Sequence, residues 1–240
     1  MKTFNLGGLL LVLAATGIAC GPGDTGEKTP TGTPAAIDPA DFQTTIDNPL
    51  YPLAPGSAWV YEGEEVDPDT GETFTTRVEV TVLTETDTVA GVEVLVVKDE
   101  AFEDGELIES TLDYYAQHKD GSVYYFGERV DNYENGEVVN HNGSWLAGEG
   151  DNLPGIAMPG GDVSVGAVFE QEKAPGIAED RSTVLSVGET VTVPAGTFED
   201  CIKTRDENPL DQATETKFFC PGVGFVREEF EEGDLSLVSY

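Results

Sequence analysis

The chain has 240 residues, of which 46 are acidic and only 12 are basic, so its formal net charge is −34 at pH 7. Proteins bind nucleic acid mainly by neutralising phosphates with Lys and Arg, so this balance argues against a nucleic-acid partner and, equally, against direct adsorption to anionic lipid. It indicates a solvated, aggregation-resistant surface, with a specific cationic partner as the sharper alternative.

The first twenty residues, MKTFNLGGLLLVLAATGIAC, contain one basic residue, an apolar core and a run of small residues that ends at Cys20. This pattern is typical of a secretory signal peptide over residues 1–19 and is too short for a membrane span. TGIAC resembles a bacterial lipobox, which implies cleavage before Cys20 and a palmitate-type lipid anchor on that residue. Gly17 stands where lipoboxes usually have Leu, so ordinary cleavage after Ala19 is the alternative.

Residues 20–41 continue as a segment rich in Gly, Pro and Thr and poor in large apolar side chains. Such a segment cannot bury enough surface to offset its ordering entropy, so we predict a disordered tether behind the lipidated cysteine. We therefore expect an exported protein whose membrane partner is reached through the lipid. In a cell with two membranes, Gly21 in place of Asp resembles the outer-membrane sorting pattern.

Alternation of apolar with polar residues dominates residues 42–240, which we predict to form a single all-β domain. In FTTRVEVTVLTET, for example, Val78, Val80 and Val82 share one face of a strand. Two-residue turn signals then separate successive strands, and they lie at Ala90-Gly91, Asp104-Gly105, Asp120-Gly121 and Asn135-Gly136. Asp-Gly and Asn-Gly are strong hairpin signals, because both central residues of a type I′ turn need positive φ. The consequence is an antiparallel meander.

The alternation lapses between Trp145 and Val168, where LAGEGDNLPGIAMPGGDVSVG predicts a long Gly- and Pro-rich loop. Strands resume after it and continue to the end of the chain. Loops of this length in a compact domain are usually functional or mobile.

Three stretches stand in order along the domain: YPLAPGSAWVYEG, VTVPAGTFEDCIKTR and KFFCPGVGFVREE. They resemble the signposts of a broad group of uncharacterised secreted bacterial proteins, some labelled TapB-like. The resemblance implies a single antiparallel sheet, strongly curved into a half-barrel or open barrel, somewhat like those of bacterial lipoprotein carriers. It implies no activity.

Signals for catalysis and metal binding are weak. The chain has no G-x-S-x-G elbow, and its two histidines read as a strand-end residue, His118, and an exposed loop residue, His141. Two acidic turns resemble calcium sites: DPDTGE from Asp67 and DNYENGE with Asp131, Glu134 and Glu137. The first departs from the EF-hand pattern at its Gly and lacks the final Glu, so a hairpin turn is the preferred reading. We expect no catalytic residue, no metal ligand and no cofactor.

Aromatic residues are the other clue to binding. Trp59 and Tyr61 share one face of an early strand, and DYYAQHKDGSVYYFGE places Tyr114, Tyr115, Tyr124, Tyr125 and Phe126 in one hairpin. Adjacent tyrosines in a strand point to opposite faces, so one ring of each pair is predicted to be core, and the other either packs across strands or lines a groove.

With Cys20 assigned to lipid, Cys201 and Cys220 remain as a pair in an exported chain, which predicts a disulfide. Strand patterns flank both cysteines, so the bridge would join two antiparallel strands. Its register would place Ile202 opposite Phe219, and Lys203 opposite Phe218.

The leading functional hypothesis is therefore a lipid-anchored, non-enzymatic envelope protein that binds a small apolar ligand or an envelope partner. It predicts a sizeable apolar groove with GDNLPGIAMPGGD near its mouth. A calcium-dependent structural or adhesion protein is the alternative. A secreted hydrolase is the third reading, and it requires a cleft with a buried carboxylate pair or a histidine against Ser or Asp.

Overall fold

A computed structural model describes residues 37–68 and 70–240, so Cys20 and the predicted signal peptide lie outside the described residues. Within the described part there is one 3-10 turn, η1, and no helix long and apolar enough to cross a membrane. Fifteen strands form one antiparallel sheet. The elements are η1 (Pro39–Asp41), β1 (Phe42–Gln43), β2 (Ala58–Val66), β3 (Thr73–Val89), β4 (Val92–Glu103), β5 (Glu106–His118), β6 (Val123–Glu134), β7 (Glu137–Asn140), β8 (Trp145–Leu146), β9 (Gly155–Met158), β10 (Val168–Glu170), β11 (Arg181–Val193), β12 (Gly196–Glu207), β13 (Thr214–Cys220), β14 (Gly224–Phe230) and β15 (Gly233–Ser239).

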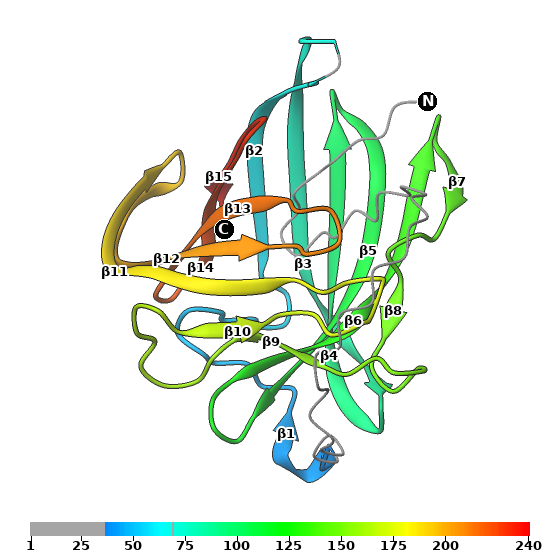
Figure 1. The fold of residues 1–240 in the computed structure, drawn as a ribbon, viewed down its shortest axis with the longest axis vertical. Coiled ribbons are helices and arrows are strands. Elements are labelled where there is room, and N and C mark those ends of the chain that lie inside the picture. Colours follow the sequence, from blue (N-terminus) through cyan, green and yellow to red (C-terminus); the bar gives the residue numbers. More distant parts are fainter. Residues whose placement is uncertain (1–36, 69) are drawn as a thin grey trace, which may run out of the picture.

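The sheet is a meander with two halves, β2 to β7 and β10 to β15, and the ladder between β15 and β2 joins them. Its order is β10-β11-β12-β13-β14-β15-β2-β3-β4-β5-β6-β7, so the C-terminal strand β15 pairs with β2. In Figure 1, β2 to β6 run along the long axis of the molecule while β11 to β13 lie across it. The sheet therefore curls over its own face, and no ladder closes it into a barrel, which confirms the predicted all-β, strongly curved meander.

The hairpin turns follow the predicted chemistry at three of the four sites. Positive φ angles occur at both residues of Ala90-Gly91 (51° and 81°), Asp104-Gly105 (46° and 84°) and Asn135-Gly136 (53° and 77°). At Asp120-Gly121 only the glycine has positive φ, because β5 and β6 are joined by a longer connection over residues 119–122.

The predicted long loop differs in part, because it contains the short strand β9. This strand pairs with β6, placing Tyr124 opposite Ile156. Its four residues lie between Pro154 and Pro159, a run too short for alternation to distinguish it from a loop.

Burial follows the predicted alternation in β3 and exceeds it in β4. Val78, Val80 and Val82 are buried as expected. In β4, however, the run from Val94 to Val97 is buried at every position, so both faces of this strand are covered. The second covered face is the one that looks into the concave side of the curled sheet.

Cys201 and Cys220 form a disulfide with a Cα–Cα distance of 4.1 Å. The β12–β13 register beside it pairs Ile202 with Phe219 and Lys203 with Phe218, as the sequence predicts. Both cysteines are fully buried, so the bridge belongs to the core.

We expect the double variant Cys201→Ala/Cys220→Ala to lose about 3 kcal/mol of unfolding free energy, since the bridge closes a loop of 19 residues in the unfolded chain. Urea denaturation of the variant and the wild type measures this difference. A thiol assay on native wild-type protein should find no reactive thiol among residues 37–240, and an unchanged urea midpoint in the variant would contradict the expectation.

Residues 44–57, which we call the strap, cross one end of the curled sheet. The backbone N–H groups of Asp47 and Asn48 both donate to Gln117 Oε1, at 2.8 and 3.0 Å. The strap folds back on itself at the Ile46–Leu53 bridge, and its Pro49 carbonyl accepts from Gly222 N. The strap is therefore fastened to both halves of the sheet.

Candidate functional site

A cavity of about 40 Å³ lies on the concave side of the sheet. Strands β2 to β5 form one wall, β13 and β14 the opposite wall, and the strap covers it with Tyr51, Pro52 and Leu53. Five aromatic side chains of the sheet line it: Trp59, Tyr61, Tyr115, Phe219 and Phe225.

The aromatic walls are fixed by hydrogen bonds at their polar ends. Trp59 Nε1 donates to the carbonyl of Val223, and the Tyr61 hydroxyl donates to the carbonyl of Phe225, both at 3.1 Å. The Tyr51 hydroxyl lies 3.3 Å from that of Tyr115. These rings therefore have defined positions, and they also pack on one another, as Tyr61 does on Phe225 with ring centroids 5.1 Å apart.

Register places two carboxyl groups in this largely aromatic and aliphatic surface, which also carries Gln171 and Lys217. Across the sheet, Asp99 of β4 lies opposite Val80 of β3, and Asp113 of β5 lies opposite Val97 of β4. Asp99 and Asp113 are thus diagonal neighbours on adjacent strands, a relation in which side chains remain within reach of each other.

Asp99 is the least satisfied of these groups. Its side chain is 4 % exposed, and no hydrogen-bond partner reaches Oδ1. Burial raises the pKa of Asp99 well above its usual value, and the nearby Asp113 and Glu109 carboxyls raise it further. An uncompensated polar group in such a place costs free energy unless it is protonated or finds a ligand.

Asp113 has one strong partner, because the Tyr125 hydroxyl donates to its Oδ1 at 2.6 Å. Burial nevertheless raises the pKa of Asp113 to about 7, outweighing this hydrogen bond. Tyr125 is in turn stacked on Tyr115 with ring centroids 4.9 Å apart. The cavity therefore has one carboxyl held in place and one that is unpartnered at Oδ1.

These two residues belong to a larger set of carboxyl groups inside the curled sheet, which we call the acid belt. The belt consists of Asp99, Glu109, Asp113, Glu128, Glu172, Asp180, Asp206, Glu215 and Glu228. Burial raises the pKa of most of its members, because ionised carboxylates are poorly solvated there.

Lys217 of β13 supplies positive charge to the belt. Its ammonium lies 3.1 Å from Glu215, 3.4 Å from Glu228 and 3.5 Å from Asp206, and its side chain is 8 % exposed. Burial alone would lower the pKa of Lys217, but the surrounding carboxylates raise it well above its usual value. Lys217 is therefore a structural cation and not an activated nucleophile.

The volume of the cavity limits the size of a ligand that it could hold. About 40 Å³ holds water-sized guests, whereas pockets for drug-sized ligands measure roughly 300–1,000 Å³. The expectation of a sizeable apolar groove is therefore wrong for this cavity, whose lining includes carboxyl groups. A sugar ring with its attacking water does not fit, so the buried carboxyl pair gives no support to glycoside hydrolysis.

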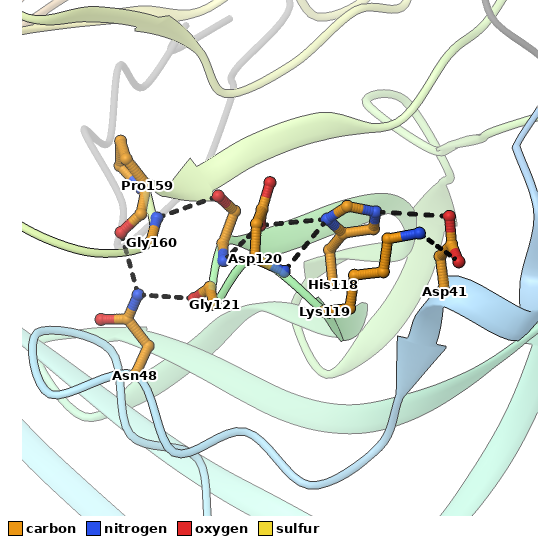
Figure 2. Close-up of polar contacts among 9 residues, drawn as sticks. Asp41, Asn48, His118, Lys119, Asp120, Gly121, Pro159 and Gly160 are labelled. Carbon is orange, nitrogen blue, oxygen red and sulfur yellow. Dashed lines mark hydrogen bonds and ion pairs between the residues drawn. The ribbon is translucent and has the colours of Figure 1, made fainter.

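The predicted loop does not form the mouth of the cavity. Its residues between 147 and 163 are absent from the cavity lining. They pack against the strap, because Asn48 Nδ2 donates to the carbonyls of Gly121 and Pro159, at 3.0 and 2.9 Å (Figure 2). Gly160 N donates to Ser122 Oγ, which completes this junction.

His118 ends β5, as predicted, and lies in a polar network next to this junction (Figure 2). Its Nδ1 is 3.0 Å from Asp120 Oδ1, and its Nε2 is 3.8 Å from Asp41 Oδ2. Asp41 Oδ1 also forms an ion pair with Lys119 Nζ at 2.7 Å, and the hydrogen bond from Lys119 lowers the pKa of Asp41. The ring packs on Phe42, so this network fastens the beginning of the described chain to the β5–β6 connection.

The other sequence candidates do not assemble a site. His141 lies on the surface with Nδ1 2.8 Å from Asp131 Oδ1. Asp67 organises a turn, accepting from Gly71 N through its carbonyl and from Thr70 N through its side chain. Glu134 and Glu137 flank the Asn135-Gly136 turn, and among residues 37–68 and 70–240 no three His, Cys, Asp or Glu side chains have metal-binding geometry.

The aromatic hairpin divides between core and cavity as its alternation predicts. Tyr115 lines the cavity and Tyr125 is buried behind it. On the other face, Tyr114 is buried and Tyr124 is half-buried against Phe42 at 5.3 Å.

We did not identify Asp99, Asp113 or Lys217 as interior residues from the sequence. In β4 the predicted core face carried Val92, Val94 and Val96, which placed Asp99 on the face assigned to solvent. The available signal was Leu95 and Val97, two apolar residues in the same phase as Asp99.

Comparisons with known proteins add little. No protein-family model matches the sequence. No curated protein matches it. One solved structure, described as a "putative lipoprotein" from Parabacteroides distasonis, is similar at 16% identity with a TM-score of 0.39, covering 82% of this chain and 99% of that chain. A likeness at this level transfers neither fold nor function.

Proposed function

We propose that this chain is an exported, lipid-anchored protein of the bacterial cell envelope whose cavity binds a small organic cation. The anchor is proposed from the lipobox-like TGIAC and the tether after Cys20, both outside the described residues. The ordered signposts of the sequence support placing it with the TapB-like group of secreted bacterial proteins.

The observation that carries the ligand proposal is the buried Asp99 carboxyl, whose Oδ1 has no hydrogen-bond partner, in an aromatic-walled cavity. Aromatic faces attract cations through their quadrupole, and carboxylates attract them by charge, so the two together favour an ammonium group. An uncharged apolar guest would instead leave Asp99 facing hydrocarbon. At about 40 Å³ the cavity suits an ammonium or methylammonium head, with any longer body lying against the strap.

Binding of a cation next to Asp99 would release a proton from the Asp99 carboxyl group. Burial, together with the nearby Asp113 and Glu109 carboxyls, raises the pKa of Asp99 well above its usual value, so the free protein favours the protonated form of this carboxyl. A bound cation favours the carboxylate and lowers this pKa, which releases the proton. Affinity should therefore rise with pH, by up to about tenfold per pH unit while Asp99 is protonated in the free state.

Thermal shift and calorimetry with methylammonium chloride test the proposal. We expect millimolar methylammonium to raise Tm, equal concentrations of methanol to leave it unchanged, and calorimetry in two buffers to report release of about one proton per cation bound. Affinity should increase with pH as long as Asp99 is protonated in the free protein.

The decisive variant is Asp99→Asn, which keeps the shape of the side chain and removes its charge. We expect it to abolish the methylammonium response. Glu93→Gln is the matched control, because Glu93 is exposed on the same strand and should leave the response intact. Equal binding by Asp99→Asn and the wild type would refute the proposal, as would the absence of any response in the wild type.

A further inference from the structure

In the described part of the chain, the curled sheet has a seam at which two neighbouring strands are not joined by a ladder. Strand β9 pairs with β6, and β10 pairs with β11. β9 and β10 lie side by side, yet the described residues join this edge through the single isolated bridge between Leu153 and Lys173. Gly155 packs closely here, since a Cβ on it would lie 1.9 Å from the carbonyl oxygen of Gln171. Residues 170–173 lie at this seam.

That segment faces the cavity on one side and an outer pocket on the other. Gln171 lines the inner cavity, while its neighbour Glu172 lines a surface pocket of about 340 Å³. The outer pocket is predominantly acidic, with Asp151, Glu170, Glu172 and Glu179 against Lys173 and Arg181. Lys173 is paired with Glu170 at 2.9 Å, which leaves the acidic character of the pocket dominant.

The acid belt continues from this pocket to the cavity. Glu172 is 2 % exposed and interacts electrostatically with Glu128 of β6. Glu128 lies directly opposite Asp113 in the β5–β6 register, and Asp113 is the diagonal neighbour of Asp99. Glu172, Glu128, Asp113 and Asp99 therefore form a line of carboxyl groups from the outer pocket to the cavity, and each attracts a cation more strongly once it gives up its proton.

We propose that the seam between β9 and β10 is the entrance to the cavity for cationic ligands, with Glu172 as the first buried carboxyl on the route. The strap offers a less favourable entrance, because hydrogen bonds from Asp47, Asn48 and Gly222 hold it to both halves of the sheet. This inference rests on the proposed function, since it names the path by which the same cavity is reached.

A covalent clamp across the seam tests the entrance. Leu153 and Lys173 are directly opposite in an antiparallel bridge, a spacing compatible with a disulfide, so the double variant Leu153→Cys/Lys173→Cys should cross-link on mild oxidation. The probe is ¹³C-methylammonium, and its exchange rate between free and bound states is measured by NMR line shape. We expect the oxidised clamp to slow exchange at least tenfold while leaving Kd within about twofold of the wild type.

Three controls make the result specific. The single variants Leu153→Cys and Lys173→Cys reveal any effect of losing the original side chains. A disulfide clamp at Thr88→Cys/Glu93→Cys, an exposed pair in the β3–β4 ladder, reveals any general stiffening of the sheet by a cross-link. Glu172→Gln, which needs no cross-link, should slow exchange several-fold at unchanged Kd. Unaltered exchange in both the seam clamp and Glu172→Gln would overturn the entrance, whereas no binding in any form, including the wild type, would overturn the proposed function itself.

Discussion

Replacing Lys217 with methionine should lower the free energy of unfolding at pH 7 by about 3–5 kcal/mol. Methionine keeps most of the volume of the side chain but removes the cation that faces Asp206, Glu215 and Glu228. Breaking a buried ion network by deleting one partner leaves uncompensated buried charge, which is one of the mechanisms behind the largest losses seen for single substitutions. Urea denaturation followed by tryptophan fluorescence measures the change.

The pH dependence of this variant separates charge from packing. Burial raises the pKa of Glu228 well above its usual value, so this carboxyl takes up a proton more readily at pH 5, and the loss in Lys217→Met should be smaller there than at pH 7. Lys203→Met is the matched control, because Lys203 lies in the neighbouring strand over the ring of Phe218, at 5.2 Å from the ring centroid, and should cost less than about 1 kcal/mol. An equal loss at both pH values would indicate that the packing of the Lys217 chain, and not its charge, is what matters.

Raising the pH from 4 to 8 should destabilise the wild-type protein. Burial raises the pKa of Glu109 to about 7 and that of Asp113 to about 7, whereas their unfolded values lie near 4. The folded state then binds more protons than the unfolded state throughout this window. The stabilisation is fully present below the unfolded pKa values and is lost as the pH rises through the folded ones.

Each of these two groups should account for a loss on the order of 3 kcal/mol, so the urea midpoint should be highest near pH 4 to 5 and should fall toward pH 8. The double variant Glu109→Gln/Asp113→Asn should flatten this slope, since its side chains do not titrate. Groups with lowered pKa values, such as Glu215 beside Lys217, act in the opposite sense at lower pH. A midpoint that rises from pH 5 to pH 8 would contradict the assignment of protonated carboxyl groups to the interior.

Much of the fold could be predicted because its signals are local. Alternation located β3, the Asn135-Gly136 turn located the β6–β7 hairpin, and the phase around Cys201 and Cys220 predicted the β12–β13 register. Strand β9 was missed because a run of four residues between two prolines carries too little pattern.

The candidate site could be predicted only in part. Trp59 and Tyr61 were placed together correctly, since two residues two apart in a strand share a face whatever the tertiary structure. Asp99 could not be found in this way. Alternation identifies one buried face of a strand, and Asp99 lies on the second face, which is buried because distant strands lie over it.

The sequence by itself therefore determined the all-β class, the turns and the cysteine register, each of which depends on residues close together in the chain or on strand parity. The tertiary structure alone decided that Asp99, Asp113 and Lys217 lie inside. That outcome depends on pairing β15 with β2 and on bringing β13 and β14 to the cavity that β2 to β5 also line, which are long-range arrangements. Charged residues in strands are ordinarily solvated. The curl of the sheet buries Asp99, Asp113 and Lys217, so that their charged forms lose contact with water and depend on partners inside the protein.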